Sequence, residues 1–390
     1  MSNHAAAVRA RIGDVDALRG FALLGIFIVN ITFMASGYPG NLVTDPDFSS
    51  PLDDAVRTLS SVFIDMKFYL LFSFLFGYSF TLQMDAAARA GADFRPRMLR
   101  RIGGLFVIGG LHIVFLYGGD VLTTYAVACV ALFLMRNVSD RTALRVAGGL
   151  YAAVLASLVA TGLLMDRTQF LPSSDEARAN AEQATQALLG GWGDVIGEHL
   201  AGLPLLVMQA VTLQGPAALA AFLVGMVVGR RGLLANVRGD ERVLRRIQVV
   251  GFPVGIAGGL LYALGGGNGE ALPVAASFAT APLLIAAYVA TLLRVMHSSR
   301  GEVVRGWLAP AGRIALTNYL GQSLAGLLIF SGIGLGLAGE LSPLGTLAVA
   351  LLVFAVQVVV SAWWLRTYRY GPAEWVLRWV TNARRPAWRG

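Results

Sequence analysis

Residues 95–136 read RPRMLRRIGGLFVIGGLHIVFLYGGDVLTTYAVACVALFLMR. Four arginines precede an apolar run at 102–118, a Gly-Gly-Asp turn follows, and a second apolar run at 121–135 ends at another arginine. A helix that rises ~1.5 Å per residue needs roughly 17–25 apolar residues to cross a hydrocarbon core ~30 Å thick. The stretch therefore predicts two antiparallel membrane helices whose basic ends lie on the same side.

The same pattern extends over the whole chain. Apolar runs occur at 17–36, 59–82, 102–118, 121–135, 143–165, 200–229, 245–265, 271–293, 311–335 and 345–366. Twenty-seven of the 31 basic residues precede the first run or fall in every second segment after it, and the alternate segments hold only Arg57, Arg167 and Arg178. Because basic segments stay in the cytoplasm, the pattern predicts an all-α polytopic bundle of about ten transmembrane helices with both termini cytoplasmic.

Composition agrees with this fold and excludes a soluble domain, because 56% of the 390 residues are hydrophobic and only 14% are charged. We expect one integral-membrane domain over residues 1–390, with a five-helix half at 1–165, a periplasmic segment at 166–199 and a second five-helix half at 200–390. Cytoplasmic arginines facing anionic headgroups explain the net charge of +8. The expected partners are membrane lipids and a second copy of the chain in a dimer, with no nucleic acid and no metal.

The outer segment carries a helix signal. Ser173 followed by Glu176 forms a capping-box pattern, and the Ala-rich stretch through Leu189 predicts a helix that lies on the outer surface. Three glycines, at 190, 191 and 193, then predict a break before the sixth run.

Polar residues inside the runs are the main functional signal, since an ionisable group in a membrane costs about 2.5–3.5 kcal/mol on insertion scales. The predicted helix directions put one set at a common depth near the outer side: Asn30, Asp65, Lys67, His112 and Asp120. Two interpretations stay open. The five residues form a network that holds and moves protons, or Lys67 and an aspartate form a structural ion pair while His112 bonds the backbone.

A second polar set lies at the cytoplasmic ends of the runs. It comprises Arg19 in the first run, Arg313, Asn318 and Gln322 in the ninth, and Arg369 and Glu374 in the aromatic tail. An interfacial aromatic belt with snorkelling arginines accounts for the tail without a ligand. The same arginines and indoles also suit a planar, phosphorylated ligand that arrives from the cytoplasm.

Four motifs carry a resemblance that spans residues 11–381. They are DALRGFALLG at 16–25, GLH at 110–112 with GDVL at 119–122, GR at 312–313 with ALTNYL at 315–320, and RYGPAEW at 369–375. In this order they resemble the YeiB-like family of bacterial inner-membrane proteins, whose C-terminal half is a domain of unknown function. The resemblance implies a multi-pass protein of the bacterial inner membrane.

The opening helix, with Arg19-Gly20 and Val29-Asn30, is also similar to that of a broader superfamily of transmembrane acyltransferases. Its members take an acyl group from cytoplasmic acyl-CoA and deliver it across the membrane. Asn30 matches an asparagine near the transferred group in the lysosomal enzyme that acetylates heparan sulfate. The essential histidine of that enzyme lies in the first outer loop, whereas residues 37–58 contain none here.

The resulting hypothesis is an acyltransferase-like protein that uses acyl-CoA. His112, oriented by Asp120 or Asp65, would be the general base, and Asn30 and Lys67 would stabilise the oxyanion. The predicted cofactor-binding residues are Arg19, Arg313, Asn318, Gln322, Arg369 and Glu374. The alternatives are a proton-coupled transporter or channel that uses the outer polar set as a relay, and a structural protein that binds lipids or a partner.

Overall fold

The computed structural model describes residues 2–166, 171–234, 237, 239–299 and 301–389, without the side chains of residues 2–12. Arg167, Arg238 and Arg300, which contribute to the charge pattern, lie outside the described residues, as do the side chains of Arg9 and Arg11.

The described part of the chain is helical and holds no strand beyond an isolated bridge between Tyr368 and Arg389. The first eight α-helices are α1 (Ser2–Ala35), α2 (Pro51–Phe63), α3 (Phe68–Arg89), α4 (Phe94–Phe115), α5 (Leu122–Leu134), α6 (Asp140–Leu164), α7 (Ser174–Leu189) and α8 (Trp192–Ala201). The others are α9 (Leu203–Gln209), α10 (Gly215–Arg231), α11 (Glu241–Leu264), α12 (Ala271–Met296), α13 (Gly301–Arg313), α14 (Ala315–Phe330), α15 (Pro343–Trp364) and α16 (Pro372–Asn382).

The helices confirm a polytopic membrane bundle. Among the described residues, eight helical stretches are long and apolar enough to cross a membrane: Gly13–Ala35, Pro51–Arg89, Phe94–Phe115, Asp140–Leu164, Trp192–Arg231, Glu241–Leu264, Ala271–Met296 and Pro343–Trp364. Two shorter apolar helices, α5 and α14, coincide with the fourth and ninth predicted runs. All ten apolar runs of the sequence therefore correspond to helices.

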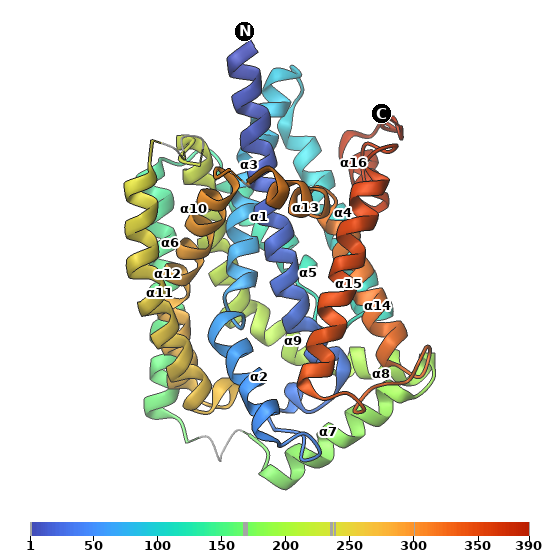
Figure 1. Ribbon diagram of the computed structural model, residues 1–390. Helices are drawn as coiled ribbons and strands as arrows, with labels where there is room; N and C mark the ends of the chain where they lie inside the picture. Colours follow the sequence, from blue (N-terminus) through green and yellow to red (C-terminus); the bar gives the residue numbers. More distant parts are fainter. Residues whose placement is uncertain (1, 167–170, 235–236, 238, 300, 390) are drawn as a thin grey trace.

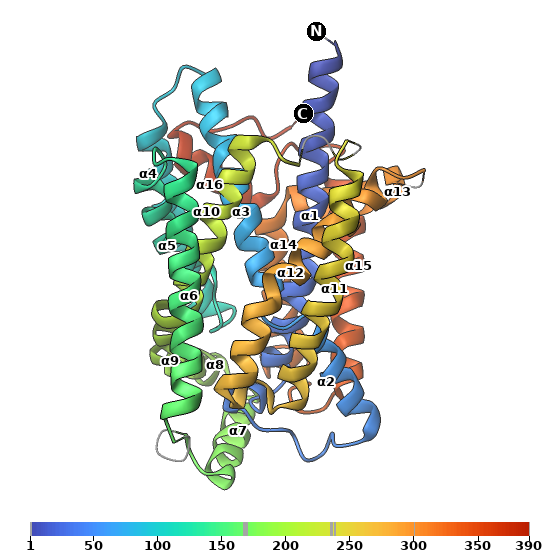
Figure 2. The ribbon, with the colours of Figure 1, turned by 90° about the vertical axis from the view of Figure 1, so that its left-hand side faces the viewer.

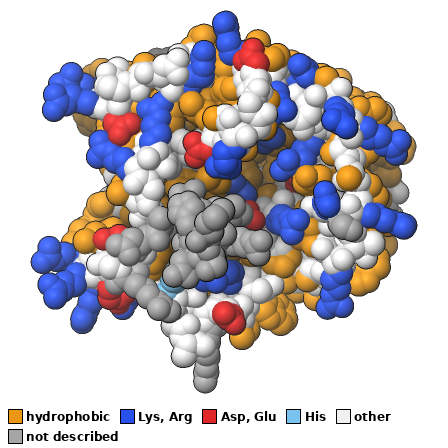
Figure 3. Space-filling view, turned by 90° about the horizontal axis from the view of Figure 1, so that it is seen from above, with side chains coloured by type: hydrophobic (Ala, Val, Ile, Leu, Met, Phe, Trp, Pro, Cys, Tyr) orange, Lys and Arg blue, Asp and Glu red, His pale blue; other side chains and the backbone are white. Residues whose placement is uncertain are grey.

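Both ends of the chain lie at one end of the bundle, which we call the terminal end, and α7 lies at the opposite or distal end (Figure 1). Figure 2 shows α13 lying crosswise at the terminal end. Arginine side chains surround the terminal end when it is viewed from above (Figure 3). This arrangement agrees with an even number of crossings and with basic segments gathered on one side.

Two predicted spans are interrupted. The run at 59–82 breaks between α2 and α3, where Met66 adopts a left-handed φ of 64°. The run at 311–335 is divided at Ile314 into the end of α13 and the membrane helix α14, which stops at Phe330. Broken membrane helices are tolerated where the freed backbone groups find partners inside the protein, and both breaks carry polar residues of the predicted site.

The outer segment folds as predicted. Ser173 and Glu176 form the reciprocal capping box at the start of α7, which runs to Leu189. The glycines at 190 and 191 separate it from α8, which starts at Trp192. The segment therefore closes the distal end with two short helices, as Figure 1 shows.

Close backbone contact fixes α1 against α13. A Cβ at Gly20 would lie 2.3 Å from the Leu308 carbonyl oxygen, and a Cβ at Gly312 would lie 1.8 Å from that of Asp16. Only glycine permits such an approach. Arg19 is next to Gly20 and Arg313 is next to Gly312, so the contact holds the two arginines on neighbouring helices.

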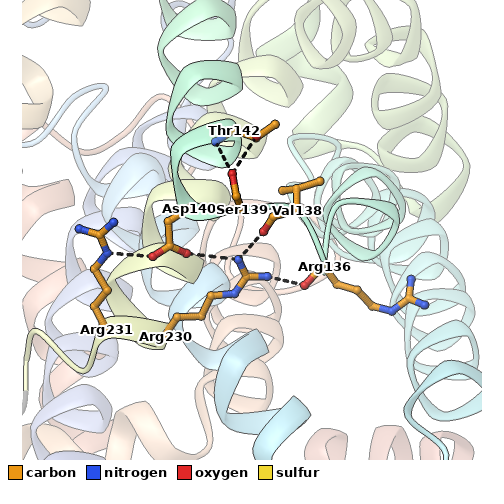
Figure 4. A network of polar contacts seen from close by, with 7 residues as sticks. All are labelled: Arg136, Val138, Ser139, Asp140, Thr142, Arg230 and Arg231. Carbon is orange, nitrogen blue, oxygen red and sulfur yellow. Dashed lines mark hydrogen bonds and ion pairs between the residues drawn. The ribbon is translucent and has the colours of Figure 1, made fainter.

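Some terminal-end arginines hold segments together. Arg230 at the end of α10 donates to the Val138 carbonyl at 2.9 Å and also to the Arg136 carbonyl. Both Arg230 and Arg231 pair with Asp140 at the start of α6, at 3.4 and 2.8 Å (Figure 4). We call this group the Asp140 clamp, and it joins α10 to the α5–α6 turn.

Candidate functional site

A buried histidine–aspartate pair lies deep in the bundle. His112 is in the last turn of α4, and the loop after that helix returns Asp120 to it. His112 Nδ1 lies 3.0 Å from Asp120 Oδ1, and both side chains are 0% exposed. Gly109, one turn before His112, allows this approach, because a Cβ there would lie 2.9 Å from the second Asp120 oxygen.

The Asp120 carboxylate is held in place by the start of α5. Its Oδ2 accepts hydrogen bonds from the Thr123 amide at 2.7 Å and from the Thr123 hydroxyl at 2.8 Å. Asp120 therefore caps α5 with one oxygen and orients the imidazole with the other. Of the two carboxylates that the sequence offered to His112, the structure selects Asp120.

The other imidazole nitrogen faces α14. His112 Nε2 lies 2.8 Å from the Ser323 hydroxyl, which is 1% exposed. The Tyr319 ring, one turn earlier on α14, is 5.0 Å from the imidazole between centroids. A hydroxyl, an imidazole and a carboxylate thus form a row across three segments of the chain, joined by a hydrogen bond at Nε2 and by an ion-pair contact at Nδ1 that lacks hydrogen-bond geometry.

A cavity of about 450 Å³ lies on the terminal-end side of this row. We call it the arginine cavity, because its wall includes Arg19, Arg97, Arg101, Arg313 and Arg378 against the single carboxylate of Glu374. Its deep end is formed by Val121, Leu122 and Tyr319, next to Asp120 in the chain and to His112 in space. A strongly positive cavity therefore reaches from the terminal end to the buried pair.

A second cavity, of about 340 Å³, lies on the distal side, and we call it the distal cavity. Met34 of α1, Tyr117 and Gly118 of the α4–α5 loop, and Gly326 of α14 line it. Tyr117 contacts the His112 ring edge-on, with centroids 6.2 Å apart. The buried row thus lies between two cavities, with Tyr319 on one side and Tyr117 on the other.

The predicted cofactor-binding residues separate into two groups. Arg19, Arg313 and Glu374 line the arginine cavity. Asn318 and Gln322 face α15 instead, where Asn318 donates to Ser361 at 2.9 Å and Gln322 donates to Gln357 at 3.1 Å. Arg369 is exposed and contributes its backbone carbonyl to Arg313 at 3.1 Å. The structure therefore gives Asn318, Gln322 and Arg369 packing roles, outside the cavity wall.

Glu374 belongs to the cavity wall but bonds the protein. Its carboxylate accepts from the amides of Leu316 at 2.7 Å and Thr317 at 3.2 Å, and from the Thr317 hydroxyl at 2.5 Å. It therefore caps the first turn of α14, which has no cap of its own at Ile314. Burial raises the pKa of Glu374 above its usual value, against the opposing effect of these hydrogen bonds.

Among the five cavity arginines, only Arg19 takes part in an ion pair in the described part of the chain. Arg97 and Arg101 stand out because neither side chain has a hydrogen bond or a ring contact there, whereas Arg313 donates to the Arg369 carbonyl and Arg378 lies over the Tyr370 ring. The Nε of Arg101 is buried without a hydrogen-bond partner there. By contrast, Arg19 is paired with Asp16 at 2.5 Å and donates to Ser79. In the sequence, Arg97 and Arg101 indicated only the topology. The reason is that an arginine before a membrane helix has the same sequence context whether its side chain faces lipid or a cavity.

The outer polar set does not form one network. Asp65 accepts from the Ser61 hydroxyl at 3.0 Å, and Lys67 donates to the Ser61 carbonyl at 2.8 Å and lies over the Tyr262 ring. These contacts bridge the α2–α3 break, and none in the described residues joins them to His112. Asn30, on α1, is partly buried. The expected five-residue network is therefore two separate pairs, Asp65 with Lys67 and His112 with Asp120, and Asn30 is in neither.

Comparison with known proteins gives the following similarities. The family model described as "Protein of unknown function (DUF418)" matches residues 228–384. The uncharacterized protein YxaH of Bacillus subtilis is 30% identical over 391 residues, which cover 95% of this chain and 94% of that protein. An uncharacterized 39.9 kDa protein of Bacillus acidopullulyticus is 28% identical, covering 97% and 96% of the two chains. The uncharacterized protein YeiB of Escherichia coli is 26% identical, covering 94% and 95%.

Proposed function

Since this chain belongs to the YeiB-like family of membrane proteins, we propose from its own geometry that it is a membrane-embedded acyltransferase. It would accept an acyl group from cytoplasmic acyl-CoA and deliver it to an acceptor on the periplasmic side of the bacterial inner membrane. The terminal end would face the cytoplasm, where arginine-rich segments stay during insertion.

One observation supports this proposal above all others. The His112–Asp120 pair lies between the arginine cavity on the terminal-end side and the distal cavity on the other side. A thioester with a phosphorylated carrier would bind in the arginine cavity, because arginine forks bind phosphate oxygens with paired, charge-assisted hydrogen bonds. Its reactive end would lie at Tyr319. An acceptor would use the distal cavity, and the reaction would occur in the partition between the two.

The buried pair has the chemistry that the reaction needs. Asp120 Oδ1 lies 3.0 Å from His112 Nδ1, where its charge would favour a proton on Nδ1 and leave Nε2 as the basic nitrogen. A base held in this way removes a proton from an attacking hydroxyl or amine. Because both side chains are 0% exposed, water would be excluded and hydrolysis of the thioester suppressed.

The transporter alternative is less well supported by the described contacts. A relay needs neighbouring groups that pass a proton along the membrane normal. The side-chain hydrogen bonds of Lys67 and Asp65 are made to Ser61, beside the α2–α3 break. The polar contacts of the His112 side chain are with Asp120 and Ser323, and no hydrogen bond or ion pair among the described residues joins the two groups.

Calorimetric titration of acetyl-CoA into the protein in lipid nanodiscs tests the proposal. We expect saturable binding to the wild type, little change in affinity for His112→Ala, and weaker binding for Arg313→Ala. The matched control is Arg366→Ala, because Arg366 is exposed at the terminal end and lines neither cavity.

Absence of binding to the wild type at millimolar acetyl-CoA would contradict the donor assignment. Equal losses for Arg313→Ala and Arg366→Ala would show general charge attraction in place of a site. Thiol release from bound acetyl-CoA, followed with a thiol reagent, should fall about 10²–10⁴-fold in His112→Ala, which is the usual effect of removing a general base.

A further inference from the structure

Ser323 occupies the position of a nucleophile relative to the buried pair. Its hydroxyl is 2.8 Å from His112 Nε2, and His112 Nδ1 is 3.0 Å from Asp120 Oδ1. This order of hydroxyl, imidazole and carboxylate is the one that activates serine in acyl-transfer enzymes on unrelated folds. The sequence identified His112 and Asp120 as candidates but treated Ser323 only as one more polar residue of the ninth run.

The contacts of the row suit one direction of proton transfer. Thr123 holds Asp120 with two hydrogen bonds, so the carboxylate is fixed with its other oxygen 3.0 Å from His112 Nδ1. The carboxylate charge favours a proton on Nδ1, and in that tautomer Nε2 accepts from Ser323. The only other acceptor that the structure gives Ser323 is the Tyr319 carbonyl, at 3.4 Å, so the contact with His112 is the shorter one.

Helix periodicity places Ser323 on the stripe of α14 that connects the two cavities. Tyr319, four residues earlier, lines the deep end of the arginine cavity. Gly326 and Leu327, three and four residues later, line the distal cavity. Residues at these spacings share one helix face. The Ser323 hydroxyl is therefore the group on this face that lies between the proposed donor site and the proposed acceptor site.

We propose that Ser323 is the catalytic nucleophile and carries the acyl group as a covalent ester between two half-reactions. In the first, Ser323 Oγ attacks the carbonyl carbon of the acyl thioester while His112 Nε2 takes its proton. The C–S bond breaks, and the thiol leaves with that proton. In the second, an acceptor hydroxyl or amine from the distal cavity gives its proton to His112 and attacks the ester, and Ser323 regains a proton as it leaves.

This inference rests on the proposed function for the identity of the donor, so its test uses two reagents. One is acetyl-CoA with an isotopically labelled acetyl group, quenched in acid. The other is diisopropyl fluorophosphate, which phosphorylates an activated serine with loss of fluoride and needs no acyl donor. Intact-protein and peptide mass spectrometry locate each modification in the protein purified in nanodiscs.

We expect both reagents to modify Ser323 in the wild type. Labelling should be absent in Ser323→Ala and reduced about 10²-fold or more in His112→Ala, because the base is lost. Ser323→Cys should form a thioester that neutral hydroxylamine cleaves, whereas the wild-type ester should survive it. The control is Ser277→Ala, since Ser277 on α12 is fully buried like Ser323 but its hydroxyl has no hydrogen-bond partner among the described residues.

Failure of both reagents to modify Ser323 would overturn the nucleophile assignment, even if acetyl-CoA binds and the proposed function stands with direct transfer. A label mapped to another residue would overturn it as well. Modification of Ser323 by diisopropyl fluorophosphate in a protein that binds no acetyl-CoA would support the nucleophile and contradict the proposed donor. If Ser323→Ala does not fold, the mapped wild-type label and the hydroxylamine response of Ser323→Cys decide the question.

Discussion

Two groups of arginines lie at the terminal end, and they differ in what their guanidinium groups contact. In the Asp140 clamp, Arg230 and Arg231 bond a carboxylate and two backbone carbonyls. In the arginine cavity, Arg97 and Arg101 have no ion pair among the described residues. The only carboxylate of the cavity wall, Glu374, bonds the first turn of α14 instead.

The difference separates arginines that stabilise the fold from arginines that have donors left for a ligand. A partly buried guanidinium without an acceptor is unfavourable, because its lost hydration is not replaced. In the proposed function, a bound anion would complete these hydrogen bonds. The cavity arginines and the clamp arginines have the same sequence context, so only packing distinguishes them.

The largest effect is expected at Arg101. Arg101→Ala should weaken acetyl-CoA binding by about tenfold to a hundredfold, corresponding to the roughly 1.5–3 kcal/mol of a hydrogen bond to a charged group. Isothermal calorimetry in nanodiscs measures it. Unchanged affinity would remove Arg101 from the donor site and abolish the contrast with the clamp.

A moderate effect on stability is expected at Glu374. Loss of the α14 cap in Glu374→Ala should cost about 0.5–2 kcal/mol and lower the apparent melting temperature. Acetyl-CoA affinity should not fall, because the carboxylate serves α14 and adds negative charge to the cavity. A loss of affinity without a change in melting temperature would instead make Glu374 a ligand-binding residue.

The pH dependence of stability sharpens the assignment of Glu374. Its pKa in the folded protein is raised above the usual value near 4.5, so the folded state binds the proton more tightly than the unfolded state does. Stability should therefore increase as the pH falls through the raised pKa toward 4.5, and decrease as the pH rises. Glu374→Gln should lack this component when melting temperatures of the two proteins are compared from pH 7.5 to pH 5.

The smallest effect is expected in the clamp. The Arg231–Asp140 pair is half exposed, with side-chain exposures of 53% and 27%, and such pairs contribute about 0–1 kcal/mol. Arg231→Ala should lower the melting temperature slightly and leave acetyl-CoA affinity unchanged. A loss of affinity as large as that of Arg101→Ala would show that the two groups of arginines are equivalent.

Much of the fold could be predicted from the sequence, because hydrophobic length and arginine placement act locally along the chain. The ten apolar runs, the common side of the termini and the helix that ends at Leu189 were all predictable in this way. The breaks at Met66 and Ile314 were not. Their cause is the tertiary packing that supplies partners to the freed backbone, such as Lys67 at the Ser61 carbonyl.

The candidate site was predictable only in part. His112 and Asp120 are close in sequence, so their common depth followed from helix direction, but the choice of Asp120 over Asp65 as the partner of His112 did not. Ser323 is separated from His112 by 211 residues, and a serine in a membrane helix commonly bonds only the carbonyl four residues earlier. Only the packing of α14 against α4 shows its other partner. The same packing turns Asn318 and Gln322 toward α15 and away from the cavity.

The most direct test of the central claim is a cryo-electron microscopy structure of the protein in nanodiscs with acetyl-CoA. The account predicts phosphate density within hydrogen-bond distance of Arg97 and Arg101, and the acyl end beside Tyr319, towards Ser323. Density for the ligand outside the arginine cavity, or with its phosphates away from these arginines, would contradict it.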